Sequence, residues 1–161
     1  TKVGSGAVDA GNVYSPTAQQ AFEKLPLKFA NGLKIYGLLP GEKLEDLVFQ
    51  PGTWKRRLLF FRRPVSANTL ILLTGNYVVV IREELGVPHG WIISYIPRNN
   101  IVGMQSRPRD QWNDISVQLK REGQTAEYKL LLKNEAARDW RALWIKHGGQ
   151  WQDIPVNEGV S

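Results

Sequence analysis

Basic side chains, rather than catalytic ones, dominate the part of this sequence best suited to chemistry. Residues 52–63 read GTWKRRLLFFRR, in which five basic residues bracket four consecutive large apolar residues. Residues 47–82 contain no Asp or Glu, so the segment stays positive whichever way its chain turns. Cations that converge on one point, with backbone donors nearby, bind phosphate groups. Lys55, Arg56 and Arg57, beside the turn QPGTW, are therefore the candidate residues for binding an anion or an anionic lipid.

The same run also fits an ordinary strand whose middle is buried and whose ends are solvated. Side chains alternate along a strand, and here both faces are apolar in the middle and basic at each end. The pattern favours this interpretation over a dedicated site. Along an extended chain Arg62 and Arg63 would lie roughly 20 Å beyond the first three basic residues, so we expect them on a different surface. If the segment meets anionic lipid, each basic residue near the membrane contributes about 1 kcal/mol.

Signatures of catalysis and of metal binding are absent from the sequence. The chain has no Cys, which excludes disulfides, thiolate nucleophiles and cysteine-based metal sites. Its two histidines, His89 in a turn and His147 at the end of the last predicted helix, do not form a paired-histidine motif. The carboxylate pairs at 45–46 and 83–84 are chain neighbours, which point to opposite faces of a strand. We expect no enzymatic activity, no metal and no cofactor.

Composition indicates a globular protein with a preference for anionic partners. The 161 residues suffice for one domain with a real core, and 42% hydrophobic with 22% charged residues is an ordinary balance. A formal charge of +6 and a pI of about 9.7 favour phosphate, nucleic acid or an acidic membrane surface. No apolar stretch is long enough for a membrane-spanning helix, and the N-terminus has no signal-peptide pattern. The compartment stays open, with a cytoplasmic or membrane-peripheral location expected.

Local patterns divide the chain into four parts. Residues 1–14 are a flexible lead-in, residues 15–39 a short helix with an extension, residues 40–148 the main domain, and residues 149–161 a tail of loop. Ser15 before a proline predicts the N-cap of that first helix. Strand-length runs separated by turn signals then predict about seven antiparallel strands, and eight runs qualify: 42–50, 54–63, 68–74, 77–83, 91–96, 101–106, 114–122 and 125–133.

Turn and cap residues locate two hairpins and a final helix. The pair 75–76, Gly-Asn, predicts a two-residue turn with positive φ angles, and Gly123 predicts a second turn. Asn134 predicts the N-cap of a helix that carries Trp140 and Trp144 on one stripe. Such a helix would pack its two tryptophans against the strands and cover an open corner between them.

This order of elements resembles the pleckstrin-homology-like (PH-like) domains, most closely the bacterial ones. The resemblance rests on TLILLTGNYVVVI, WIISYIPRNNIVGMQ, ISVQLKREGQTAEYKLLL and NEAARDWRALW, and it covers roughly residues 40–147. It implies a mainly β, α+β fold: a bent barrel of about seven antiparallel strands capped by a C-terminal helix, preceded by a short N-terminal helix. Phosphoinositide-binding members use a Lys near the end of the first strand and Lys or Arg pairs in the second. Lys55 and Arg57 match the second-strand part, but no Lys or Arg lies between Lys43 and Lys55 to match the first.

The resemblance implies a class of role rather than a particular partner, because such folds host many functions. The expected function is a non-catalytic binding or scaffolding module for a protein partner or for its own copies, within a larger or multi-component system. The alternative is peripheral binding to anionic membrane lipid through a basic first hairpin. A lesser alternative is nucleic-acid binding, in which Trp112 stacks on a base while Arg107 and Arg109 contact phosphate. A groove beside the last helix is a further place for a peptide, added as an extra strand.

Overall fold

The computed structural model describes residues 14–58, 61–85 and 90–155, with the backbone alone for residues 54–65. Its helical elements are α1 (Pro16–Glu23), α2 (Leu27–Gly32), the π-helical turn η1 (Leu33–Gly37), the 3-10 turn η2 (Arg98–Asn100) and α3 (Asn134–Lys146). Its strands are β1 (Leu44–Gln50), β2 (Thr53–Leu58), β3 (Phe61–Ser66), β4 (Thr69–Thr74), β5 (Tyr77–Glu83), β6 (Trp91–Pro97), β7 (Ile101–Arg109), β8 (Trp112–Arg121), β9 (Gln124–Lys133) and β10 (Trp151–Asp153).

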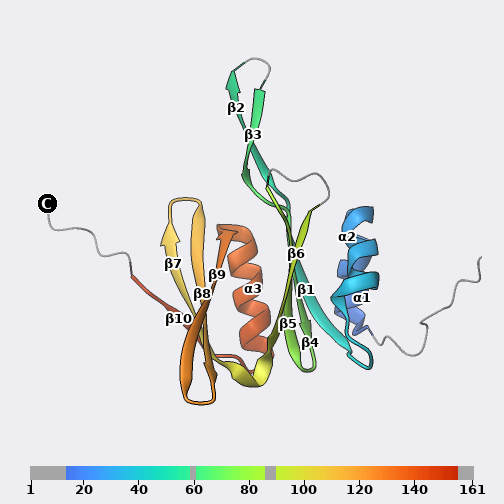
Figure 1. Cartoon of the computed structure of the whole chain (residues 1–161), viewed down its shortest axis with the longest axis vertical. Coiled ribbons are helices and arrows are strands. Elements are labelled where there is room, and N and C mark those ends of the chain that lie inside the picture. The colour runs from blue at the N-terminus through green and yellow to red at the C-terminus, as the bar shows by residue number, and fades with distance from the viewer. Residues whose placement is uncertain (1–13, 59–60, 86–89, 156–161) are drawn as a thin grey trace, which may run out of the picture.

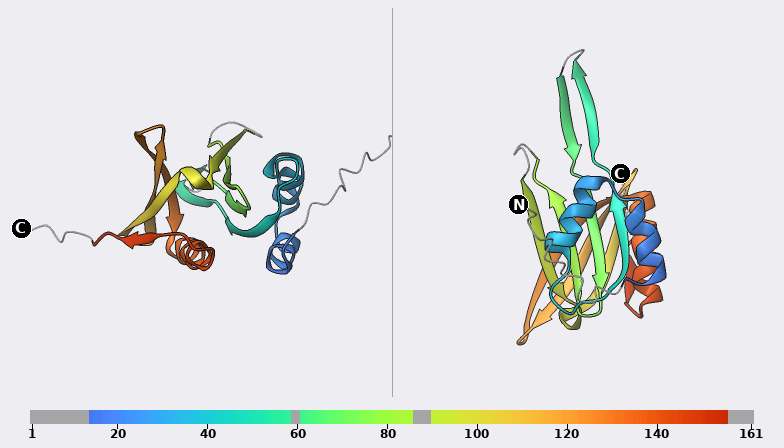
Figure 2. Two further views of the ribbon diagram at one scale, coloured as in Figure 1. Left: turned by 90° about the horizontal axis from the view of Figure 1, so that it is seen from below. Right: turned by 90° about the vertical axis from the view of Figure 1, so that its right-hand side faces the viewer.

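The strands form two four-stranded sheets and a separate two-stranded hairpin (Figure 1). The first sheet has the order β1-β4-β5-β6, and the second has the order β10-β7-β8-β9. The predicted bent barrel does not close, because among the described strands no ladder joins one sheet to the other. The C-terminal helix α3 lies in the opening between the sheets, as the resemblance implied, and α1 and α2 cover the outer face of the first sheet (Figures 1 and 2).

Two hydrophobic cores lie on opposite faces of the first sheet. Ile71 and Leu73 of β4 belong to the core under α3, whereas Leu70 and Leu72 belong to the core under α1 and α2. All six residues of β4 are therefore buried, which explains its unbroken apolar run. Ser15 is the N-cap of α1, as predicted, because its hydroxyl accepts a hydrogen bond from a backbone N–H in the first turn of that helix. The N-terminal helices thus belong to the packed body of the molecule.

The predicted strand at 54–63 is wrong, because the chain reverses direction within it. β2 pairs antiparallel with β3 from Thr53↔Ser66 to Leu58↔Phe61, and this ladder prolongs the pairing of β1 with β4. Pro64, which directly follows the basic run, lies inside β3. Once β1 and β4 pair, the chain between them has to leave and return along the same ladder. Tertiary pairing therefore divides a run that has no break in its own pattern.

The turn between β4 and β5 lies where the sequence predicted it but has a different conformation. Neither residue of the pair 75–76 has a positive φ angle. The turn is instead closed by side chains: the Tyr77 N–H donates to the Thr74 hydroxyl at 3.0 Å, and the Asn76 N–H donates to the Glu42 carboxylate at 3.1 Å. The turn before β9 does match its prediction, with a φ of 81° at Gly123.

Asn134 is the first residue of α3 rather than its N-cap, which is Lys133. The Asn134 amide donates to the Asp110 carbonyl at 2.9 Å, so this side chain joins the helix start to the β7–β8 turn instead of capping the helix. The tryptophan stripe matches its prediction. Trp140 is 0% exposed and Trp144 is 5% exposed, and both pack in the core between the sheets.

Two segments predicted as loop are strands. The Arg107–Arg109 stretch was placed in a strand connection, but it forms the end of β7. The tail from residue 149 was predicted as loop throughout, but Trp151–Asp153 form β10, which runs parallel to β7. In both cases an available backbone ladder decides the conformation, and no local pattern in the sequence signals it.

Candidate functional site

The β2–β3 hairpin is the element that gathers the basic run. It projects beyond both sheets along the long axis of the molecule (Figure 1). Lys55 is the cross-strand partner of Arg63, and Arg56 is the partner of Arg62. The ladder is irregular between Arg56 and Leu58, so Arg57 lies at a bulge. The expectation that the last two arginines belong to a different surface is therefore wrong.

Direct pairing of like charges needs an explanation. Partners across an antiparallel ladder have Cα atoms about 4.5–5.5 Å apart, and like charges facing each other at that spacing destabilise a sheet. An isolated two-stranded hairpin is already of marginal stability in water. Residues 47–82 supply no carboxylate to offset the five cations. The hairpin thus has the charge pattern of an element that meets an anionic surface.

The base of the hairpin is held firmly to the body. The Gly52 N–H donates to the Asn68 side-chain oxygen at 2.7 Å, and the Thr53 N–H donates to the Ser66 hydroxyl at 3.1 Å. A Cβ atom at Gly52 would lie 2.9 Å from the Ser66 carbonyl oxygen, so this close approach requires glycine. The Asn68 amide also donates to Glu83 of β5. These contacts fix the direction in which the hairpin leaves the first sheet.

Glu83 is an acidic residue at the base of the hairpin, and its charge is already balanced. Partial burial raises its pKa, but hydrogen bonds from Lys28 and Asn68 outweigh that effect and leave the pKa below its ordinary value. The Lys28 ammonium lies 2.5 Å from the Glu83 carboxylate. Glu83 is therefore ionised at neutral pH, and its charge is balanced by Lys28.

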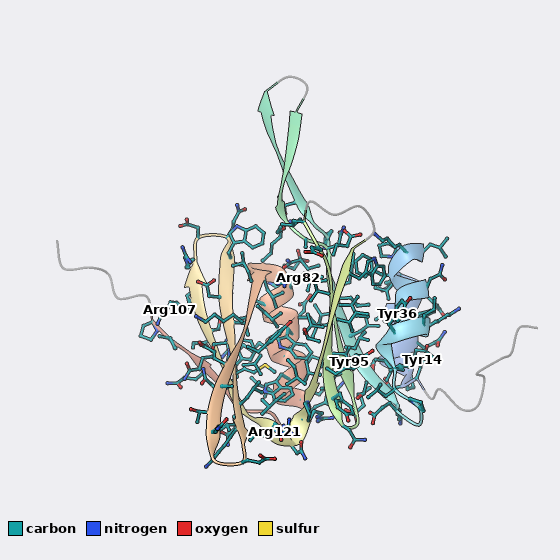
Figure 3. All side chains as sticks on the ribbon, viewed as in Figure 1. Tyr14, Tyr36, Arg82, Tyr95, Arg107 and Arg121 are labelled. Carbon is teal, nitrogen blue, oxygen red and sulfur yellow. The ribbon has the colours of Figure 1, made fainter. Side chains whose placement is uncertain are left out.

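A second basic groove lies between the two sheets. It has a volume of about 430 Å³ and is lined by Arg82, Arg107, Arg109 and Lys129 among others, and Figure 3 shows that Arg82 and Arg107 come from different sheets. Arg109 forms a surface ion pair with Asp114 at 3.0 Å.

The nucleic-acid alternative needs an open ring face on Trp112. The Lys133 ammonium lies 5.9 Å from the centre of that ring, so the ring already has a cationic neighbour. Nucleic-acid binding through Trp112, Arg107 and Arg109 stays a prediction from the sequence.

His147 lies between two carboxylates that were expected to point apart. Its Nδ1 is 3.3 Å from Glu45 and its Nε2 is 3.7 Å from Asp46. The prediction of opposite faces is wrong here, because the β1–β4 register shifts between Leu44 and Asp46. Within the described ranges, no group of three or more His, Asp or Glu side chains could hold a metal ion. His89 lies outside the described residues.

The edge beside α3, where a peptide strand was expected to add, carries a strand of the chain itself. β10 pairs with Met104, Gln105 and Ser106 of β7. The Trp144 indole N–H donates to the Gln150 carbonyl at 3.0 Å, and the Ile154 N–H donates to the Ser106 carbonyl at 2.8 Å. Over these residues a partner strand would first have to displace β10.

Two sheets covered by a C-terminal helix define a PH-like α+β fold. Among solved structures, the chain is similar to the hSac2 domain from human phosphoinositide phosphatase Sac2, which has this fold. The TM-score is 0.52 and the sequence identity 11%, over 91% of this chain and 94% of that one, so the likeness concerns the fold alone. No family model and no curated protein matches the sequence significantly. None of the helices in the described part of the chain has the length and apolarity to cross a membrane.

The sequence found the first half of the basic site and missed the second. Lys55, Arg56 and Arg57 were selected, but their partners Arg62 and Arg63 were placed elsewhere because the run was taken as one strand. The sequence carried no signal for this, because the run has to return on itself only once β1 and β4 pair with each other. The base contacts through Asn68 and Ser66 had no sequence signal.

Proposed function

We propose that this chain is a peripheral binding module that engages anionic membrane lipid through the β2–β3 hairpin. The observation that carries the proposal is the cross-strand pairing of basic residues, Lys55 with Arg63 and Arg56 with Arg62, on a hairpin that projects from the body. An anionic surface would relieve the repulsion that this pairing creates. The role proposed is non-catalytic.

The apolar centre of the run supports a membrane rather than a soluble anion. β2 ends at Leu58 and β3 begins at Phe61, so these two large apolar residues are partners at the far end of the ladder. Basic residues beside large apolar ones are typical of segments that lie in the headgroup region of a bilayer. If all five cations reach the surface, their combined contribution is about 5 kcal/mol, at about 1 kcal/mol each.

The fold agrees with such a role without specifying the lipid. A similar solved domain comes from a phosphoinositide phosphatase, and PH-like folds commonly act as binding modules. A protein partner or self-association remains a prediction from the sequence. Its expected groove beside α3 is occupied by β10 over three residues of β7, so the hairpin has the stronger support.

Co-sedimentation with vesicles tests the proposal. The wild type should bind vesicles of phosphatidylcholine and phosphatidylserine in equal parts, bind weakly to phosphatidylcholine alone, and lose affinity as salt is added. Arg56→Ala/Arg57→Ala and Arg62→Ala/Arg63→Ala should each weaken binding by about 2 kcal/mol, or about thirtyfold.

A matched pair on the second sheet separates the site from net charge. Lys120→Ala/Arg121→Ala removes the same charge from neighbouring exposed residues of β8 and should leave the affinity nearly unchanged. Equal losses of vesicle affinity in all three double variants would show that the hairpin acts only through the net charge of the protein. Failure of the wild type to bind anionic vesicles at low salt would overturn the proposal.

A further inference from the structure

The outer face of the N-terminal helices carries exposed apolar and basic side chains. Leu27 is 77% exposed and Ile35 is 67% exposed, the two most exposed large hydrophobic residues among those described. We define the helix stripe as six exposed residues of α2, η1 and the end of α1: Lys24, Leu27, Lys28, Asn31, Lys34 and Ile35. Those from Leu27 onward lie in α2 and η1 mostly three or four residues apart, which places them along one side, and Lys24 is the C-cap of α1 three residues before α2.

The exposure of these two side chains is not due to a lack of core positions. Phe29 and Leu33 of the same helices are 2% and 0% exposed and fill the core against the first sheet. The segment thus has one apolar face that packs inward and further large apolar residues that point outward. A single exposed leucine needs no explanation, but two on one stripe among lysines are typical of a helix that lies in a membrane interface.

The segment also carries more basic than acidic side chains. Residues 24–41 contain three lysines and no Asp or Glu. Lys28 is held by Glu83 of β5, whereas Lys24 and Lys34 form no ion pair with any residue the structure describes. Lys34 lies 5.5 Å from the Phe22 ring centre, which holds its ammonium near the helix surface. The stripe therefore fits an anionic surface better than an acid-rich or neutral one.

The stripe begins at the end of the first sheet from which the hairpin projects. Lys28 contacts Glu83 at the last position of β5, and the Phe29 ring lies 5.2 Å from that of Trp91 at the first position of β6. Both strand positions lie at the hairpin end of the sheet. Figures 1 and 2 show α2 beside the first sheet with its start near the hairpin base. Farther along, the Tyr95 hydroxyl donates to the Tyr36 carbonyl, and Figure 3 shows both tyrosines on this side of the molecule.

We propose that the helix stripe is a second contact with the same anionic bilayer, so that the hairpin and α2 together set how the domain lies on the membrane. This inference rests on the proposed function. Leu27 and Ile35 would enter the headgroup region while Lys24 and Lys34 stay at the level of the lipid phosphates. The hairpin alone would leave the domain free to rotate about a narrow attachment, and the second contact removes that freedom.

Vesicle binding of Leu27→Asp/Ile35→Asp tests the inference. With vesicles of phosphatidylcholine and phosphatidylserine in equal parts, this variant should bind at least about tenfold more weakly than wild type, since two apolar contacts are replaced by negative charges. The control is Val102→Asp/Ile145→Asp, which changes two residues of 57% and 48% exposure on β7 and α3. It adds the same charge away from the stripe and should lose clearly less affinity.

Site-specific labelling gives a second readout that does not depend on affinity. The chain has no Cys, so Leu27→Cys and Val102→Cys each provide one labelling site for an environment-sensitive fluorophore. The label at position 27 should shift to shorter wavelength on anionic vesicles, whereas the label at 102 should not. Circular dichroism checks that each variant is folded.

The outcomes distinguish this inference from the proposed function. If hairpin variants lose binding but the stripe variant and the label at 27 do not respond, the second contact is wrong and the hairpin proposal stands. If the wild type does not bind vesicles at all, both fail. If light scattering shows that Leu27→Asp/Ile35→Asp lowers the mass of the wild-type particle without changing vesicle affinity, the stripe is a surface between copies of the chain and the inference is overturned.

Discussion

The β2–β3 and β8–β9 hairpins are both antiparallel and both rich in charge, but they differ in which residues are neighbours in the ladder. In β8–β9 the Glu127 carboxylate accepts from Ser116 and lies 3.5 Å from Lys129, so charges of opposite sign neighbour each other. The inner residues of that hairpin, such as Val117 and Leu132, are fully buried. In β2–β3 like charges are direct partners and the ladder stands apart from both sheets.

Under the proposed function, the difference separates elements that the fold needs from an element that a partner needs. A hairpin that packs against a core and pairs its own charges is stabilised by the chain alone. For a projecting hairpin with like charges as ladder partners, we expect a small contribution to folding and a large one to binding.

Removing the projecting hairpin should have the largest effect on binding and a small effect on folding. Replacing residues 54–65 with a short Gly-Ser link should remove up to about 5 kcal/mol of vesicle affinity, because all five cations are lost. The free energy of unfolding in urea should change by less than about 1 kcal/mol, since surface changes away from the core have small effects. A large loss of stability would show that the hairpin supports the body, which would break the contrast.

Truncating a buried residue of the β8–β9 hairpin should have the opposite pattern of effects. It should lower the free energy of unfolding and leave vesicle affinity unchanged. Leu132 is 0% exposed in β9, so Leu132→Ala should lower the free energy of unfolding by about 2–5 kcal/mol. Leu131 is the neighbouring residue and is 47% exposed, so Leu131→Ala serves as the control and should change stability by less than about 0.5 kcal/mol. Vesicle affinity of the folded protein should be the same for both variants. If Leu132→Ala and Leu131→Ala destabilise the protein equally, β9 is not held to the core through one face only.

Acid pH should lower the stability of the body of the molecule before it affects the hairpin. This is the smallest of the three expected effects. Burial raises the pKa of Glu42, but hydrogen bonds from Thr74 and Asn76 outweigh it and leave the pKa below its ordinary 4.5. Because the folded pKa is the lower one, the stabilisation is complete above pH 4.5 and is lost as pH falls through the folded pKa. Glu42→Gln should flatten this loss in urea titrations at acid pH. An unchanged slope would show that Glu42 does not close the turn.

Sequence reasoning reached the parts of the molecule that are determined locally. Ser15 predicted a helix start, Gly123 predicted a turn, and the spacing of Trp140 and Trp144 predicted a buried stripe, because caps, turns and helix periodicity depend on neighbouring residues. The order of strands and terminal helix was enough to indicate a PH-like fold. The acid-free basic run was also visible, which is why part of the candidate site was found.

The remaining features depend on which strands pair. Arg62 faces Arg56, Trp151 adds a strand to β7, and one β-bulge brings both Glu45 and Asp46 to His147. Backbone ladders between distant segments decide each of these, and no local pattern reports them. The same holds for the closeness of the helix stripe to the hairpin base, which requires the two cores on either side of the first sheet.

By itself, then, the sequence determined the charge of this protein, its apolar runs, the start of its first helix and the turn at Gly123, since these depend on residue type and near neighbours. Only the tertiary structure decided that GTWKRRLLFFRR is a hairpin and that its five cations belong to one projecting element. The physical reason is that pairing of β1 with β4 fixes where the chain between them must leave the body and return, and this pairing joins residues far apart along the chain.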